Sequence, residues 1–271
     1  PYPRCPMPQS KFLIVSNARA GSTWVETMLG VLPDVAVDYE FKWRPKYTPA
    51  PVHVVIPDAT FRCGDALARI APDYPVVGSK LVLDPREHTP EEYAELRGTI
   101  GPDVRVVHLS RSLTEVYYSW SRGVYHVLDK DRCEHWTHGR PPCEMLGAID
   151  SNCGAMTSYP NAGGQRVNPD DCERDVKVLL AHEQWMAEFA RTHPNFVRVD
   201  YAEVPELFPA VARFVGSRAT VEQIADAVSR PPTLKILAPR FEDYFTNADE
   251  LLAICQKYEA RRVERNAARA A

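Results

Sequence analysis

The sequence predicts an α/β protein built on a mostly parallel β-sheet flanked by helices. Short apolar runs of strand length alternate with stretches of helical periodicity, a pattern typical of parallel sheets covered by helices. The first apolar run also leads directly into a turn of small residues and then a helix start. The 271 residues have a composition close to the globular average and show no internal repeat, so we expect one domain over residues 1–271.

The strand candidates are short apolar runs bounded by polar or turn-forming residues. They cover residues 12–16, 76–83, 104–110 and 196–201. Helix starts are indicated where a Thr or Asn cap precedes Glu or Gln by three positions, at 89–92, 220–223 and 247–250. Residues 112–126 carry apolar side chains at helical spacing and predict a helix with one face on the sheet. The C-terminal residues 257–271 predict a solvated helix whose arginines lie on the surface.

Residues 128–172 have little periodicity and many turn formers, which indicates a long ordered loop excursion with a functional role. Four of the seven cysteines fall in it: Cys133, Cys143, Cys153 and Cys172. We expect at least one disulfide here, while a metal site and free thiols remain alternatives, the first weakened by a spacing that fits no common zinc finger. Paired cysteines would favour a secretory lumen, and free ones the cytoplasm.

Net charge and hydropathy restrict the classes of partner that the protein can bind. A formal net charge of −4 argues against a general nucleic-acid binder. No apolar run approaches the length of about 20 residues that spans a bilayer, and the first residues contain no secretory core. Because the sequence begins with Pro1, an N-terminal signal or anchor that has been removed stays open. A homo-oligomer stays open as well.

The stretch SNARAGST, residues 16–23, has the features of an anion-binding loop between a strand and a helix. Backbone amides of residues 20–24 would point into the turn at the positive end of the helix. Ser22 and Thr23 add hydroxyl donors, and Arg19 adds a permanently charged guanidinium. The loop lacks the Gly-Lys-Ser/Thr ending of nucleotide hydrolases. An ordinary strand-to-helix turn with a capping hydroxyl is the alternative interpretation.

A second stretch, VVHLSRSLTEVYYSW, suggests a second phosphate site. Its strand ends at Arg111, and Ser119 follows a little over two helical turns later, on nearly the same side. An arginine at a strand end and a serine in the next helix can bind one phosphate together. His108, within this strand, is expected to be a hydrogen-bonded core histidine.

These two stretches together resemble sulfotransferases that use 3′-phosphoadenosine 5′-phosphosulfate (PAPS) as sulfuryl donor and release 3′-phosphoadenosine 5′-phosphate (PAP). The resemblance implies a P-loop-like sulfotransferase fold. It further implies that Arg19, Ala20, Gly21, Ser22 and Thr23 hold the 5′-phosphosulfate. Arg111 and Ser119 would hold the 3′-phosphate, and Trp24 would stack near the adenine.

Within this family the sequence looks most like the bacterial carbohydrate sulfotransferases of the trehalose type. In these, a glutamate base follows the loop at a fixed distance, and VDYEFKW places Glu40 at the matching position. Further similarities are VGSKL around Lys80, HEQWMAEF at 182–189 and VRVDYAEV at 197–204. The resemblance implies a hydroxyl acceptor on a carbohydrate or another small polar molecule. The cysteine-bearing excursion departs from the bacterial pattern, so the identity of the acceptor in the bacterial enzymes is a poor guide to the acceptor here.

The catalytic candidates are Glu40, Arg19 and Lys80. Sulfuryl transfer needs a base for the acceptor hydroxyl and positive charge on the transferring group, but no metal ion. Glu40 is the expected base, with Asp38 and His53 in reserve, although a surface glutamate in a connection after the first helix is the simpler alternative. Lys80 ends a buried run, so it meets either an anionic ligand or a carboxylate, Asp84 or Glu40.

Two other functions remain in competition with the sulfotransferase. A P-loop kinase of a small molecule would need Mg²⁺ and the missing Gly-Lys-Ser/Thr loop. A catalytically inactive nucleotide-binding scaffold would use the cysteine-bearing excursion as a partner surface, against which the presence of Arg19, Glu40, Arg111 and Ser119 argues.

Overall fold

The computed structural model of the chain describes residues 9–45, 53–84, 87–122, 127–128, 164–231, 233–234 and 240–270. These residues form a six-stranded sheet in the order β3-β2-β4-β1-β5-β7, and every neighbouring pair is parallel. The strands are β1 (Ser10–Asn17), β2 (Val35–Trp43), β3 (His53–Ile56), β4 (Val76–Leu83), β5 (Val104–Ser110) and β7 (Phe196–Asp200). Two short strands, β6 (Val127–Leu128) and β8 (Thr233–Leu234), pair antiparallel. The predicted α/β class and its parallel sheet are confirmed.

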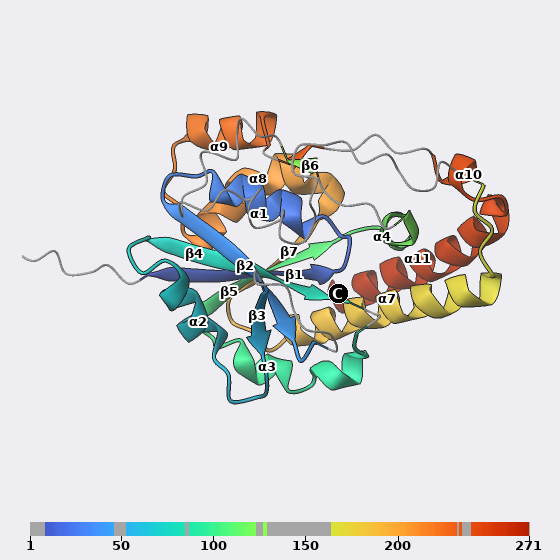
Figure 1. Ribbon diagram of the computed structural model, residues 1–271, viewed down its shortest axis with the longest axis horizontal. Coiled ribbons are helices and arrows are strands. Elements are labelled where there is room, and N and C mark those ends of the chain that lie inside the picture. The colour runs from blue at the N-terminus through green and yellow to red at the C-terminus, as the bar shows by residue number, and fades with distance from the viewer. Residues whose placement is uncertain are drawn as a thin grey trace, which may run out of the picture.

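Helices cover both faces of the sheet (Figure 1). On one face lie α1 (Ser22–Gly30), α8 (Val204–Val215) and α9 (Val221–Ser229), whose apolar side chains pack on alternate residues of the strands. On the other face lie α2 (Cys63–Ile70) and α3 (Leu96–Thr99), with the C-terminal half of α7 (Pro169–Ala190). Burial of the strands on both faces explains why β1, β4 and β5 are nearly continuous apolar runs in the sequence.

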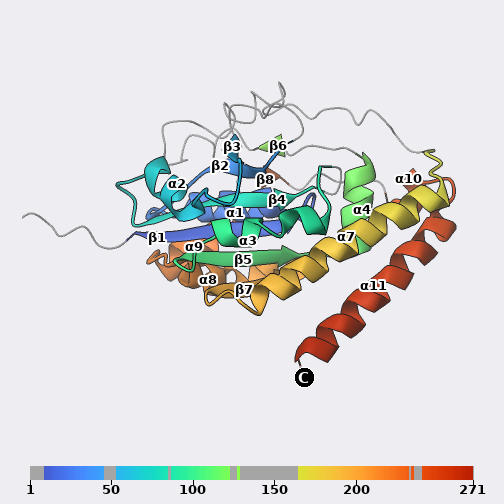
Figure 2. The ribbon, with the colours of Figure 1, turned by 90° about the horizontal axis from the view of Figure 1, so that it is seen from below.

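A third apolar cluster lies beside the sheet. It joins α7 to α4 (Leu113–Arg122), α10 (Phe241–Tyr244) and the C-terminal α11 (Ala248–Ala270). In Figure 2, α7 lies between the sheet and α11. The C-terminal helix is therefore packed against the body of the protein over its first half, through Leu251, Cys255 and Tyr258, which are all buried.

The predicted strands are present, and the structure adds two neighbouring strands that the sequence analysis did not predict. The four predicted strands correspond to β1, β4, β5 and β7. Glu40 lies in the strand β2 and not in a connection, which was the alternative interpretation. Neither β2 nor its neighbour β3 was predicted from the sequence. In β2, buried Phe41 and Trp43 alternate with charged Glu40 and Lys42, the period of two that belongs to a strand.

The predicted helix starts have mixed outcomes. Thr220 caps α9 with the expected reciprocal bonds to Gln223. Thr89 makes the same box with Glu92, but it begins only the 3₁₀ turn η1 (Pro90–Tyr93). The helix expected over 112–126 is α4, whose Leu113, Val116 and Tyr117 are buried. Residues 123–126 lie outside the described part of the chain.

The expectation for the cysteine-bearing excursion is wrong at its C-terminal end. Asn168 caps α7, so Cys172 belongs to a helix rather than to a loop. Its thiol is free and buried, in side-chain contact with the free thiol of Cys255 on α11. Cys133, Cys143 and Cys153 lie outside the described residues. Cys172 therefore forms no disulfide in the structure. No helix among the described residues is both long and apolar enough to cross a membrane.

Candidate functional site

The predicted anion-binding loop joins β1 to α1 at the carboxyl edge of the sheet. Arg19 and Gly21 have left-handed backbone conformations, with φ of 70° and 97°. Gly21 is the N-cap of α1, and since it has no side chain, the first amides of the helix receive no side-chain cap. Ser22 and Thr23 are buried in the first turn. The loop thus presents uncapped amides and two hydroxyl groups at the positive end of a helix, which suits an anion.

Arg111, expected in a second phosphate site, lies against this loop. One of its terminal nitrogens donates to the carbonyl oxygen of Arg19 at 3.3 Å, and the other contacts Glu115 at 3.3 Å. Its Nε is buried and has no hydrogen-bond partner among the described residues. A buried guanidinium nitrogen with an unused donor fits an anionic ligand. Ser119 lies further along α4 and is partly exposed.

Tyr201, which the sequence analysis did not select, covers the loop. A Cβ atom at Gly21 would lie 2.3 Å from Cε2 of Tyr201, so only glycine fits here. The Tyr201 ring is 5.3 Å from the Trp24 ring between centroids, and Cζ of Arg111 lies 4.3 Å from its centre. Burial raises the pKa of this tyrosine, against the effect of Arg111. Its position directly after β7 at the carboxyl edge is the signal that could have identified it.

The Lys80 side chain joins the loop to the expected base. Its Nζ donates to Oγ1 of Thr23 at 2.9 Å and lies 3.5 Å from Oε2 of Glu40. The strand register explains the second contact, because Glu40 of β2 pairs with Lys80 of β4. Of the alternatives left open for Lys80, namely an anionic ligand, Asp84 and Glu40, the structure shows the contact with Glu40.

Glu26 is a second carboxylate on Lys80 that the sequence analysis missed. It lies one helical turn after Thr23, is buried, and reaches Nζ of Lys80 at 3.2 Å. Burial disfavours the charged form of Lys80, but Glu26 and then Glu40 outweigh this effect and raise the pKa of the lysine. Lys80 is therefore a charged ammonium group inside the fold.

Glu40 lies between two lysines at the edge of the buried region. Its Oε1 is 3.1 Å from Nζ of Lys42, which in turn lies 3.8 Å from Glu87. The Glu40 side chain is 18% exposed, so solvent or a small substrate can reach it. The backbone of His53 lies opposite Glu40 in the β2–β3 ladder. The side chains of His53 and Asp38, the reserve bases, lie outside the described residues.

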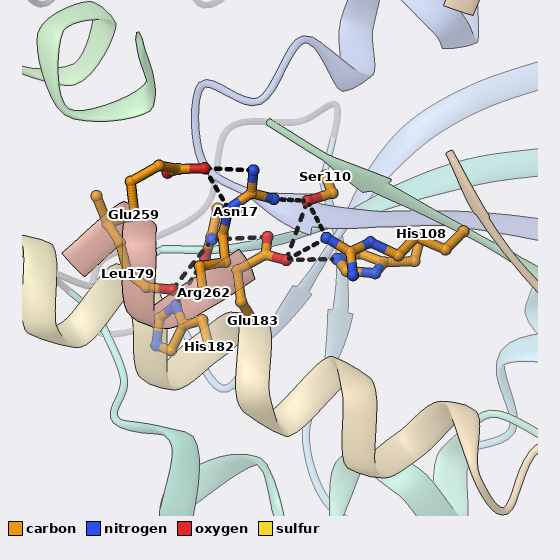
Figure 3. A network of polar contacts seen from close by, with 9 residues as sticks. Asn17, His108, Ser110, Leu179, His182, Glu183, Glu259 and Arg262 are labelled. Carbon is orange, nitrogen blue, oxygen red and sulfur yellow. Dashed lines mark hydrogen bonds and ion pairs between the residues drawn. The ribbon is translucent and has the colours of Figure 1, made fainter. Parts of the chain in front are cut away.

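Behind the two anion-binding segments is a buried polar network, drawn in Figure 3. The Glu183 carboxylate on α7 accepts from Nδ2 of Asn17 at 3.3 Å through one oxygen and from Oγ of Ser110 at 3.1 Å through the other. Asn17 ends β1 before the loop, and Ser110 ends β5 before Arg111. One carboxylate therefore connects the strand ends that carry both segments.

Basic side chains surround Glu183. His108 is buried, as expected, with Nε2 3.5 Å from the carboxylate but without a hydrogen bond among the described residues, and Arg198 lies 3.9 Å away. Burial works against the charged carboxylate, yet His108 and then Arg198 and Arg262 hold the pKa of Glu183 below its usual value. Arg262 of α11 is only 9% exposed and donates to Ser110. The expectation that the C-terminal arginines lie on the surface is therefore wrong for Arg262.

The site consists of an anion-binding loop, a guanidinium beside it, and a charged lysine shared by two carboxylates. Among the described residues no group of three or more His, Cys, Asp or Glu side chains could hold a metal ion. The arrangement can bind a doubly anionic ligand along the loop and take a proton at Glu40.

Comparisons with known proteins identify no family from the sequence. No family model matches it, and no curated protein does. Among solved structures, the chain is similar to mouse sulfotransferase SULT7A1 complexed with PAP, with 9% identity and a TM-score of 0.41. The match covers 82% of this chain and 63% of the mouse protein, so the chain spans less than two thirds of the mouse protein's length. A sulfotransferase from Alicyclobacillus acidocaldarius matches with 12% identity, a TM-score of 0.45 and 95% coverage of both chains. At these sequence identities and TM-scores, the similarity is limited to the course of the backbone and does not indicate a substrate.

Proposed function

We propose that this chain is a sulfotransferase that moves a sulfuryl group from PAPS to a hydroxyl group. The observation that carries the proposal is the position of Lys80, which donates to Thr23 in the anion-binding loop and also pairs with the Glu40 carboxylate. Lys80 therefore places a cation beside the transferring anion and also contacts the carboxylate that would be the base for the attacking hydroxyl. The resemblance of the loop and of the Arg111 segment to PAPS-binding motifs agrees with this.

The nucleotide would lie across the two anion-binding segments. The amides and hydroxyls of residues 20–24, with Arg19, bind the 5′-phosphosulfate end, and Arg111 and Ser119 bind the 3′-phosphate. Trp24 and Tyr201 border the space between these segments. The unpartnered Nε of Arg111 and the close approach at Gly21 support this placement. When bound, PAPS supplies the sulfuryl group and leaves as PAP.

Glu40 is the proposed base. A carboxylate in hydrogen-bond contact with an alcohol removes its proton as the oxygen attacks, and the partly exposed Glu40 can be reached by an acceptor. Lys80 keeps Glu40 oriented and places a positive charge beside the loop, where it stabilises negative charge on the transferring oxygens. Arg19 contributes a second, permanent charge.

The acceptor is proposed to be a carbohydrate or another small polar hydroxyl compound. Glu40, Lys42 and Glu87 form a partly exposed polar edge next to the proposed base. Neighbouring carboxylate and ammonium groups can hydrogen-bond to adjacent hydroxyls of a polyol.

The proposal is tested by calorimetric titration with PAP, AMP and ATP, each with and without Mg²⁺. A sulfotransferase binds PAP more tightly than AMP, with no dependence on Mg²⁺. Preference for ATP with Mg²⁺ would instead support the kinase. Tight PAP binding without transfer to any hydroxyl acceptor would support the inactive scaffold.

A further inference from the structure

The segment that carries Arg111 is held on both sides by the C-terminal helix. Ser110, directly before Arg111, accepts a hydrogen bond from Arg262 at 2.8 Å. The backbone N–H of Leu113, two residues after it, donates to Oε2 of Glu259 at 2.8 Å. Glu259 and Arg262 lie one turn apart on α11 and bond to each other, Nε to Oε1, at 2.7 Å (Figure 3). We call Glu259 and Arg262 the clamp.

The clamp is a buried arrangement of charges rather than a chance surface contact. The side chain of Arg262 is 10% exposed and that of Glu259 is 22% exposed. A charged group at such a position is retained only when its partners are well placed. Leu113 is the first residue of α4, so Glu259 caps that helix from another element, where the helix dipole favours a carboxylate.

Attachment of α11 to the protein does not depend on these two residues. Its first half is fixed by the buried apolar side chains of Leu251, Cys255 and Tyr258. Tyr258 also donates to Glu173 of α7 at 2.6 Å. The clamp lies beyond these contacts, and its bonds outside α11 go to residues 110 and 113 on either side of Arg111. Its hydrogen bonds to other elements therefore end on the residues that flank that guanidinium.

We propose that the Glu259–Arg262 clamp positions Arg111 for a 3′-phosphate and so makes α11 part of the nucleotide site. This inference rests on the proposed function. With its flanking residues fixed, Arg111 reaches the carbonyl oxygen of Arg19 and the Tyr201 ring and keeps its Nε free of protein partners. Glu259 and Arg262 do not touch the nucleotide; they are positioning residues.

The test uses the full chain and two nucleotides that differ only in the 3′-phosphate, PAP and AMP. The variants are Glu259→Gln and Arg262→Lys, with Glu264→Gln and Arg261→Lys as matched controls at exposed positions of the same helix. In each clamp variant we expect the affinity for PAP to fall about tenfold, because Gln accepts only a neutral hydrogen bond and Lys lacks the fork that joins Ser110 to Glu259, while the affinity for AMP stays unchanged. The control variants should retain wild-type affinity for both.

A general structural role would give a different result. If a clamp variant weakens PAP and AMP by the same factor, or leaves both unchanged, the clamp does not position Arg111. Amide hydrogen exchange of Leu113 gives a second readout that needs no ligand: in Glu259→Ala, which removes the acceptor, it should be faster than in the control Glu264→Ala, and equal rates would refute the bond itself. A wild-type protein that binds PAP no more tightly than AMP would overturn the proposed function, and this inference with it.

Discussion

Lys80 and Glu40 lie side by side on neighbouring parallel strands, with Nζ of the lysine 3.5 Å from Oε2 of the glutamate. The same Nζ donates to Thr23 in the anion-binding loop and pairs with Glu26 on α1. Lys80 is therefore a cation that two carboxylates share inside the fold, and its removal would leave Glu26 and Glu40 without that cation.

Replacement of Lys80 by Met should therefore destabilise the fold and abolish turnover. The free energy of unfolding should fall by about 3–5 kcal/mol, because Glu26 and Glu40 lose their shared cation in a buried place. Urea denaturation measures this decrease in the free energy of unfolding. The matched control is Lys11→Met, which removes a pair with the exposed Asp103 and should cost at most about 1 kcal/mol. Equal losses in both variants would show that the Lys80 pairs are worth no more than a surface pair.

Replacement of Arg111 by Ala should weaken PAP far more than AMP. Only PAP carries the 3′-phosphate that the guanidinium is proposed to bind, and a charge-assisted bond of this kind contributes about 1.5–3 kcal/mol. Titration calorimetry with both nucleotides checks it. The assignment of Arg111 fails if both lose affinity to the same extent.

Gly21→Ala should damage both folding and nucleotide binding. A left-handed backbone costs a residue with a Cβ about 1–2 kcal/mol, and the new methyl would in addition meet the ring of Tyr201 at 2.3 Å. Gly98→Ala is the control, because a Cβ there has no heavy atom within 4 Å. Thermal melts should show a clear decrease for Gly21→Ala and none for Gly98→Ala; similar melts for both would mean that the loop relaxes freely.

Stability should depend on pH through His182. This buried histidine contacts Asn17 next to the loop, and burial lowers its pKa from 6.5 to about 4. The unfolded chain therefore binds more protons between these values, so the stabilising contribution is complete above pH 6.5 and is lost as the pH falls to about 4. The loss amounts to about 3 kcal/mol.

Denaturation curves at several pH values in this window measure the effect. The slope should be smaller in His182→Gln, which cannot titrate. Glu183, with a lowered pKa, adds a loss of the same sign at lower pH and remains in the variant. Identical slopes in wild type and variant would mean that a group other than His182 causes the pH dependence of stability.

The central strands and the anion-binding loop could be predicted from sequence because their signals are local. β1, β4 and β5 are nearly continuous apolar runs, and the loop follows β1 directly. β2 was missed since its charged residues, Glu40 and Lys42, alternate with buried Phe41 and Trp43, so that it lacks the continuous apolar run of the central strands.

The partners of the site residues could not be predicted, because they come from distant parts of the chain. Glu183 meets Asn17 across 166 positions, and Arg262 meets Ser110 across 152. In the sequence Arg262 is one of several arginines in a charged helix, and no local pattern separates it from its exposed neighbours. Only the packing of α11 on α7 buries it beside β5.

The most direct test of the central claim is a transfer assay with ³⁵S-labelled PAPS and a panel of sugars and polyols. It compares wild type with Glu40→Gln and with Glu206→Gln, a control at an exposed position of α8. The account predicts label on a hydroxyl acceptor with wild type and the control. Glu40→Gln should lower kcat about 10²- to 10⁴-fold with PAP affinity nearly unchanged, as expected for loss of a general base. Full turnover by Glu40→Gln would move the base to another group, and no transfer by the wild type to any hydroxyl would contradict the proposed function.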